Sequence, residues 1–281
     1  MADDANLTAY FERIGFSGSI APTLKTLEAL QFLHPAAIAF ENIDCLIERP
    51  VRLDAPSVQQ KLIFEKRGGI CFEQNMFFKA ALQTLDFKVR TLAAEVLWNR
   101  DETADPDAPP QLGHMLLLIE IGGVSYVADV GFGGVTLTAP LKLKADAEQT
   151  TNNESYRLTE SDGVWLLEVK IGDGWRPVYR FDLAERGFAE LEAMSDKVSL
   201  SPRFRDNLIA ARAEKGRRFA LANNRLTTYT IGESKQLRVL TSVAELRQAL
   251  TDVFGISLPG SDRLDPALAR LLPAAPAAAE S

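Results

Sequence analysis

One cysteine of the sequence lies in a setting that could make its sulfur a nucleophile. Cys71 follows Gly68-Gly69 and precedes a helical pattern of apolar residues over 72–85, so we expect it at a helix N-terminus. The unpaired N–H groups and the helix dipole there favour a thiolate over a thiol and could bind a developing oxyanion. Free cysteines are more commonly buried and inert, and Cys45, which has no such turn before it, is interpreted in that way.

A histidine and an aspartate on one predicted hairpin could serve as partners of this nucleophile. Residues 115–121 and 124–130 have the composition of strands, and the two glycines between them are typical of a tight turn. Pairing about that turn makes His114 and Asp129 diagonal neighbours on one face, with Cα atoms about 7–8 Å apart. The carboxylate would then orient the imidazole and stabilise its charged form. Taken alone, the pair is about as compatible with a chance contact on an exposed face, but the apolar surroundings of Asp129 favour a buried, paired carboxylate.

Together these residues predict a Cys–His–Asp arrangement that performs acyl transfer through a thioester. The sequence does not show that the sulfur and the imidazole meet in space. It contains no HExxH, GxSxG or paired CxxC motif, and its two cysteines and two histidines are not at zinc-finger spacing. We therefore expect no metal.

The composition is that of an ordinary globular protein. The 281 residues are 46% hydrophobic and carry a net charge of −7, which argues against general binding to nucleic acid or anionic membranes. The first residues lack the features of a signal peptide, and no apolar run approaches the roughly 18 residues of a spanning helix. We expect a cytoplasmic protein that has no disulfide framework and does not associate with membranes.

The hydrophobic pattern divides the chain into four regions that must position these residues. Residues 1–86 have helical spacing and carry Cys71, and residues 87–183 alternate as the strands of an antiparallel sheet or barrel do. An irregular helical segment is expected over 184–213. Residues 214–281 contain strands, a helix that begins near Ser242, and a Pro- and Ala-rich tail that we expect to be mobile. The pattern predicts an α+β fold.

Several separated segments resemble the arylamine N-acetyltransferase family. Residues 67–75, with the sequence RGGICFEQN, are similar to the RGGxCxExN signature around the family's nucleophile, and this match is highly specific. His114-Met115 and residues 129–133 resemble its HM and DVGFG segments. Residues 10–16 and 40–43 are similar to its N-terminal stretch and its FEN segment. The order and approximate spacing agree over about the first 140 residues, and the likeness is weak after about residue 150.

The resemblance implies a helical bundle, a β-barrel and a C-terminal α/β lid, with a core like that of cysteine proteases and transglutaminases. It implies that Cys71 takes an acetyl group from acetyl-CoA, a co-substrate rather than a tightly bound cofactor. An arylamine, arylhydrazine or N-hydroxyarylamine then attacks the acetyl-cysteine in a ping-pong mechanism, a reaction of xenobiotic metabolism. His114 and Asp129 would hold the thiolate–imidazolium pair and move protons.

The same resemblance implies the binding residues. Aromatic side chains would line the acceptor pocket, and glycines would let the CoA tail approach closely: Phe40, Phe132 and Phe204, and Gly131 and Gly133. Without the resemblance, the three phenylalanines would be interpreted as core packing. The sequence departs from the family at Gly113, where threonine is common, and at Ala39, where proline is usual. These departures concern donor contacts and acceptor range.

Other functions use the same three residue types. A cysteine hydrolase or transglutaminase-like enzyme would use water or a peptide amine and would not need CoA. An amide synthase would take its acyl group from a different thioester. A non-catalytic relative that binds aromatic ligands is the third alternative, and the intact set of Cys71, His114 and Asp129 argues against it.

Overall fold

The N-terminal part of the chain is helical in the computed structural model, which describes residues 5–100 and 110–273. The side chain of Thr23 caps the second helix by accepting a hydrogen bond from the Thr26 N–H, and this helix buries Leu27 and Leu30. Helix α5 (Cys71–Thr84) is mostly buried and contains the fully buried Phe72 and Phe78. The elements are α1 (Leu7–Ile14), α2 (Leu24–Ala37), α3 (Ile43–Leu46), α4 (Ala55–Gln59), the π-helical η1 (Gln60–Phe64) and α5 (Cys71–Thr84).

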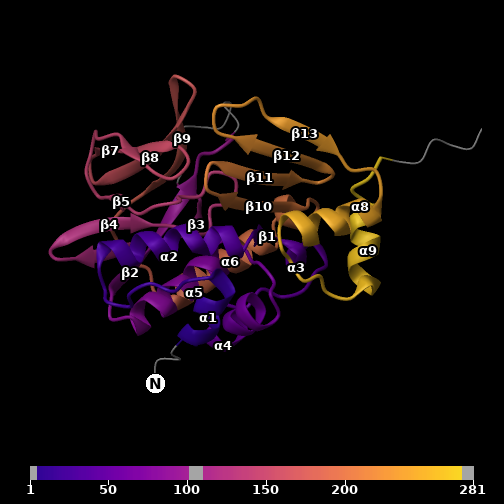
Figure 1. Ribbon diagram of the computed structural model, residues 1–281, viewed down its shortest axis with the longest axis horizontal. Helices are drawn as coiled ribbons and strands as arrows, with labels where there is room; N and C mark the ends of the chain where they lie inside the picture. Colours follow the sequence, from indigo (N-terminus) through magenta and orange to yellow (C-terminus); the bar gives the residue numbers. More distant parts are fainter. Residues whose placement is uncertain (1–4, 101–109, 274–281) are drawn as a thin grey trace, which may run out of the picture.

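The middle of the chain forms an antiparallel sheet that curls into a nearly closed barrel above these helices (Figure 1). Its spatial order is β5-β4-β3-β2-β9-β8-β7-β6. Helix α5 packs against β2 and β3, so the helix that begins at Cys71 lies on the barrel. The strands are β2 (Lys88–Val96), β3 (Leu112–Ile121), β4 (Val124–Ala128), β5 (Leu141–Lys142), β6 (Gln149–Thr150), β7 (Ser155–Ser161), β8 (Val164–Ile171) and β9 (Gly174–Phe181).

The predicted hairpin is confirmed with its register. Strands β3 and β4 pair from Ile121 opposite Val124 to Leu117 opposite Ala128. Gly122 and Gly123 both have positive φ, 59° and 78°, as a two-residue turn that follows the twist of the strands requires. This register places Asp129, the residue after β4, diagonally across from His114 on β3.

A second antiparallel sheet, in the order β1-β10-β11-β12-β13, contains four strands from the C-terminal part of the chain and one from the N-terminal part. Helices α8 and α9 lie at one end of it (Figure 1). The strands are β1 (Phe40–Glu41), β10 (Ile209–Glu214), β11 (Arg217–Ala222), β12 (Arg225–Thr230) and β13 (Gln236–Val239). The remaining helices are α6 (Phe188–Ser199), α7 (Pro202–Arg205), α8 (Val243–Gln248), the π-helical η2 (Ala249–Val253) and α9 (Ser261–Ala269).

The α+β fold is confirmed, with local differences from the sequence analysis. Residues 209–213 were expected in a helical segment, but they form most of β10. Alanines dominate this strand, and its pairing with β1 and β11 outweighs their helical preference. The helix at Ser242 begins as predicted, and β13 and α9 were not predicted. The domain boundaries remain predictions, and the tail from residue 274 lies outside the described residues.

Within the described ranges, no helix is long and apolar enough to span a membrane.

Candidate active site

Cys71 is the first residue of α5, as predicted. A Cβ at position 68 would lie 2.1 Å from the Ala39 carbonyl oxygen, so only glycine allows the chain to turn here. The N–H of Ile70 donates to the carboxylate of Glu73 at 2.9 Å, which fixes the start of the helix. The N–H groups of a helix's first turn have no carbonyl partners within the helix. Cys71 therefore lies where a positive backbone potential favours a negatively charged sulfur.

His114 and Asp129 form the hydrogen bond that the hairpin predicts. His114 Nε2 lies 2.7 Å from Asp129 Oδ2, and both side chains are buried. The other carboxylate oxygen accepts hydrogen bonds from Asn75 Nδ2 at 3.0 Å and from the Gly131 N–H at 2.9 Å. Burial raises the pKa of Asp129, but the imidazole and these donors outweigh burial and lower it overall. The aspartate is therefore charged and fully hydrogen-bonded.

The structure brings Cys71 next to the same histidine. Because Nε2 is bound to Asp129, Nδ1 is the ring nitrogen left for the sulfur, and Cys71 interacts electrostatically with His114. The sulfur also lies 4.0 Å from the carbonyl oxygen of Gly113. Burial lowers the pKa of His114, but the interactions with Asp129 and Cys71 outweigh burial and raise it to about 10. These contacts favour a protonated imidazole beside the sulfur.

Asn75 joins the helix to the hairpin, a role that the sequence analysis did not assign. Its Nδ2 also donates to the Met115 carbonyl at 2.7 Å, and its Oδ1 accepts from the Val130 N–H at 3.1 Å. One amide therefore holds β3, the segment after β4, and the Asp129 carboxylate. The available signal was the spacing, because Asn75 lies one helical turn after Cys71 and so on the same face of α5.

The two predicted glycines lie beside these residues. A Cβ on Gly131 would lie 2.8 Å from Cys71 Cα, so this glycine lets the segment after β4 approach the start of α5. Gly133 has a φ of +90°, and a Cβ there would meet the ring of Phe40 at 3.5 Å. Their predicted part in CoA binding remains a prediction.

The predicted aromatic residues are Phe132, between these two glycines, and the pair formed by Phe40 and Phe204. The ring of Phe132 packs edge-on against His114 with centroids 5.1 Å apart, and it is half-buried. Phe40 is buried and Phe204 half-buried, and their rings meet edge-on at 6.3 Å. Phe40 belongs to β1, Phe132 follows β4 and Phe204 belongs to α7, so three of the four predicted regions contribute aromatic residues near Cys71.

A buried set of charges supports the turn before Cys71. Arg67 binds the carboxylate of Glu41 at 2.7 Å and that of Asp44 at 3.1 Å. Lys61 binds Asp44 and Glu73, each at 2.7 Å. Arg67 and Glu73 therefore form buried ion pairs that support the turn.

The second histidine lies in the helical core. His34 hydrogen-bonds Tyr10 Oη at 2.9 Å and Gln74 Oε1 at 2.7 Å, and burial lowers its pKa to about 4. Across residues 5–100 and 110–273, no group of three or more His, Cys, Asp or Glu side chains could hold a metal ion.

Comparisons with known proteins agree with this geometry. A family model described as N-acetyltransferase matches residues 23–263. The arylamine N-acetyltransferase of Escherichia coli (strain K12) is 38% identical over 255 residues, which are 90% of this chain and 89% of the relative. That of Mycobacterium tuberculosis (strain H37Rv) is 36% identical over 259 residues, which are 90% of each chain.

Solved structures extend the comparison to the whole fold. The arylamine N-acetyltransferase of Mycobacterium marinum superposes with a TM-score of 0.89 and 35% identity, covering 95% of this chain and 99% of that one. A structure of the M. marinum protein in complex with CoA also has a TM-score of 0.89, with 35% identity over 95% of this chain and 100% of that one. The likeness holds after residue 150, where the sequence motifs were weak. The chain therefore belongs to the arylamine N-acetyltransferase family.

Proposed function

We propose that this enzyme transfers an acetyl group from acetyl-CoA to arylamines through a thioester on Cys71. The observation that carries the proposal is the continuous line of contacts from the Cys71 sulfur through the His114 imidazole to the Asp129 carboxylate. All three side chains are buried, so in the proposed reactive state the charge on the imidazole would be balanced by the Asp129 carboxylate on one side and the Cys71 thiolate on the other.

In the first half-reaction, the Cys71 thiolate attacks the carbonyl carbon of acetyl-CoA. A bond forms between Cys71 Sγ and this carbon, and the bond from the carbon to the CoA sulfur breaks. The N–H groups at the start of α5 lie near the developing oxyanion and can stabilise it. His114 gives its proton to the departing CoA sulfur, so CoA leaves as a thiol and His114 becomes neutral.

In the second half-reaction, the amine nitrogen attacks the acetyl carbon. The bond from that carbon to Cys71 Sγ breaks, and neutral His114 takes the proton that the amine nitrogen loses. The products are the acetylated amine and the original thiolate–imidazolium pair. Asp129 stabilises the imidazolium at the end of each cycle and holds the ring with Nδ1 toward the sulfur.

The nature of the acceptor is proposed from the side chains near Cys71. Phe132 packs on His114, and Phe40, which lies beside Gly133, packs edge-on against Phe204, so aromatic rings near Cys71 could stack with an acceptor ring. A relative from Salmonella typhimurium is named both arylamine N-acetyltransferase and N-hydroxyarylamine O-acetyltransferase. We extend the acceptors to arylamines, arylhydrazines and N-hydroxyarylamines.

The donor is proposed from the relatives. The M. marinum protein has been solved in complex with CoA, and its fold matches this chain over 95% of its length. We propose that acetyl-CoA is the acetyl donor here and that Gly133 adjoins its path to the sulfur.

A steady-state assay with cysteine variants tests the proposal. Consumption of acetyl-CoA should require an arylamine, and Cys71→Ser should abolish it without loss of fold. Cys45→Ser is the matched control, because Cys45 lies in the core and burial raises its pKa to about 12, so that change should leave turnover intact. Substantial turnover by Cys71→Ser would contradict the thioester mechanism. Acetyl-CoA consumption at the same rate without an amine would favour the hydrolase alternative.

A further inference from the structure

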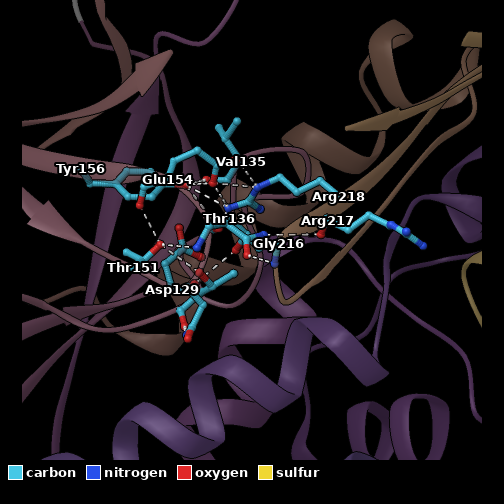
Figure 2. A network of polar contacts seen from close by, with 12 residues as sticks. Asp129, Val135, Thr136, Thr151, Glu154, Tyr156, Gly216, Arg217 and Arg218 are labelled. Atoms are coloured by element: carbon cyan, nitrogen blue, oxygen red, sulfur yellow. Dashed lines mark hydrogen bonds and ion pairs between the residues drawn. The ribbon is translucent and has the colours of Figure 1, made fainter. Parts of the chain in front are cut away.

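A buried arginine of the C-terminal sheet reaches into the barrel. Arg218 lies on β11 and is 3% exposed, and its guanidinium binds residues in the strands and connecting loops of the eight-stranded sheet rather than of its own sheet (Figure 2). Its Nε donates to the Glu154 carboxylate at 2.8 Å, and its Nη2 donates to the Thr136 carbonyl at 2.9 Å and to Tyr156 Oη at 3.2 Å. The planar guanidinium spans these acceptors at once, which a lysine ammonium on a flexible stem does not match.

The backbone carbonyl of Thr136, which accepts from Arg218, connects this arginine to the candidate active site. Thr136 Oγ1 donates to the Asp129 carbonyl at 3.2 Å and accepts from the Phe132 N–H at 3.3 Å, and the Thr136 N–H donates to the Gly133 carbonyl at 3.1 Å. Thr136 therefore closes the segment over 129–136, which carries the aspartate of the site, its aromatic residue and both glycines. Arg218 holds the residue that closes this segment.

A second set of bonds joins the same two sheets beside the ion pair. The N–H of Gly216, in the turn between β10 and β11, donates to Asn153 Oδ1 at 2.9 Å. Thr151 Oγ1 donates to the Glu154 carbonyl at 2.8 Å, so the loop that presents the Glu154 carboxylate is itself fixed. The C-terminal sheet therefore cannot shift on the barrel without unpairing a buried guanidinium, which is strongly unfavourable.

We propose that Arg218 is a positioning residue for the reaction: it fixes the 129–136 segment through Thr136 and so keeps Asp129 in line with His114. The inference rests on the proposed function, because it gives Arg218 a part in forming the reactive thiolate. Asp129 Oδ1 accepts from the Gly131 N–H within this segment, so a displaced segment would weaken a bond that holds the carboxylate. The C-terminal sheet then helps to set the reactivity of Cys71, although Arg218 contacts none of the three reacting side chains directly.

The test uses Arg218→Met, which keeps much of the side-chain volume and removes the charge, and Arg218→Lys, which restores the charge without the planar fork. The readouts are the rate of Cys71 alkylation by iodoacetamide against pH and the single-turnover rate of enzyme acetylation by acetyl-CoA. We expect Arg218→Met to slow acetylation by about 10- to 100-fold, the scale of a small misplacement of catalytic groups. Its alkylation profile should move to higher pH, and Arg218→Lys should restore part of both.

Arg157→Met is the matched control. Arg157 pairs with Glu168 at 2.6 Å on the same barrel, and within the described part of the chain it forms no hydrogen bond to the 129–136 segment. The Arg157→Met substitution should leave the alkylation profile and the acetylation rate within about twofold of the parent protein. Should Arg218→Met fail to fold, Glu154→Gln carries the same test, since it weakens the ion pair that holds the Arg218 guanidinium against the Thr136 carbonyl.

A lower melting temperature with an unchanged alkylation profile and acetylation rate would make Arg218 merely structural and overturn the inference. Failure of the unmodified protein to become acetylated would overturn the proposed function instead. The alkylation profile needs no acetyl donor, so it would still decide the role of Arg218.

Discussion

The chemistry at Cys71 depends on charges that each have a partner. His114 lies between a thiol and a carboxylate, and Asp129 receives bonds from the imidazole, an asparagine amide and a backbone N–H. An isolated charge at this depth would be strongly unfavourable. The arrangement lets the imidazole carry a proton at neutral pH, since its pKa is raised to about 10. In the proposed mechanism, that proton passes to the departing CoA sulfur.

The Asp129→Asn substitution removes the negative charge of the carboxylate and keeps the shape of the side chain. The amide fits the same space, but it cannot stabilise the imidazolium, so the pKa of His114 should fall and the thiolate should lose its counter-charge. We expect turnover to fall by about 10⁴-fold, as for the corresponding change in serine-protease triads. Steady-state kinetics measure this, with the exposed Asp252→Asn as a control for the loss of one carboxylate. Near-normal turnover by Asp129→Asn would contradict the role of Asp129.

Helix α5 and the β3–β4 hairpin bring the three side chains together. The helix and the segment after the hairpin meet at Gly131. The segment that follows β4 passes so close to the start of α5 that a methyl group on Gly131 would overlap the backbone of Cys71. Asn75, one turn further along α5, binds the same segment. The alignment of sulfur, imidazole and carboxylate is therefore a property of this contact between a helix and a hairpin.

The Gly131→Ala substitution should move the hairpin away from α5. The added Cβ would lie 2.8 Å from Cys71 Cα, a distance that only a backbone shift can relieve. Because displacements on the order of 1 Å cost catalysis about 100-fold, we expect a fall of that size in the acetylation rate. Gly134→Ala is the matched control, since nothing lies within 4 Å of its added carbon. Equal rates for the two variants would show that the close approach does not matter.

Local signals account for what the sequence predicted at this scale. The glycines at 122 and 123 determine the register of the hairpin, and the turn at 68–69 determines the start of α5. The contact between Cys71 and His114 depends on how a helix docks on a barrel, which no local pattern encodes. Arg218 stands among scattered basic residues that are typical of a solvated face, and its burial could not be predicted because its partners come from distant parts of the chain.

At the scale of the whole molecule, the N-terminal part of the chain is built into the C-terminal sheet. Strand β1 pairs with β10, with Phe40 opposite Ala211. Asn42 extends this joint: its side chain donates to the carbonyls of Phe204 and Asn207 and accepts from the N–H of Ile209. Residues near Cys71 therefore hold the segment that carries Phe204, and the regions should unfold together.

The stability of the whole molecule should depend on pH through His34. Its pKa is lowered from 6.5 to about 4 in the fold, so the unfolded chain binds a proton first as the pH falls. Its stabilising contribution is complete above pH 6.5 and is lost as the pH falls toward 4, by about 2 kcal/mol between pH 7 and pH 4.5. Urea unfolding at the two pH values measures this loss. His34→Gln, which can hydrogen-bond Tyr10 and Gln74, should lose less over the same interval, and an equal loss would contradict this account.

The central claim is that the acetyl group passes through Cys71, and intact-mass spectrometry tests it most directly. The protein is mixed with acetyl-CoA without an acceptor, the mass is recorded, and peptide mapping locates any adduct. We predict a gain of one acetyl group on Cys71 that disappears when a substituted aniline is added, with the acetylated aniline as product. An acetyl group on another residue, one on Cys71 that persists in the presence of the amine, or no adduct at all would contradict the account.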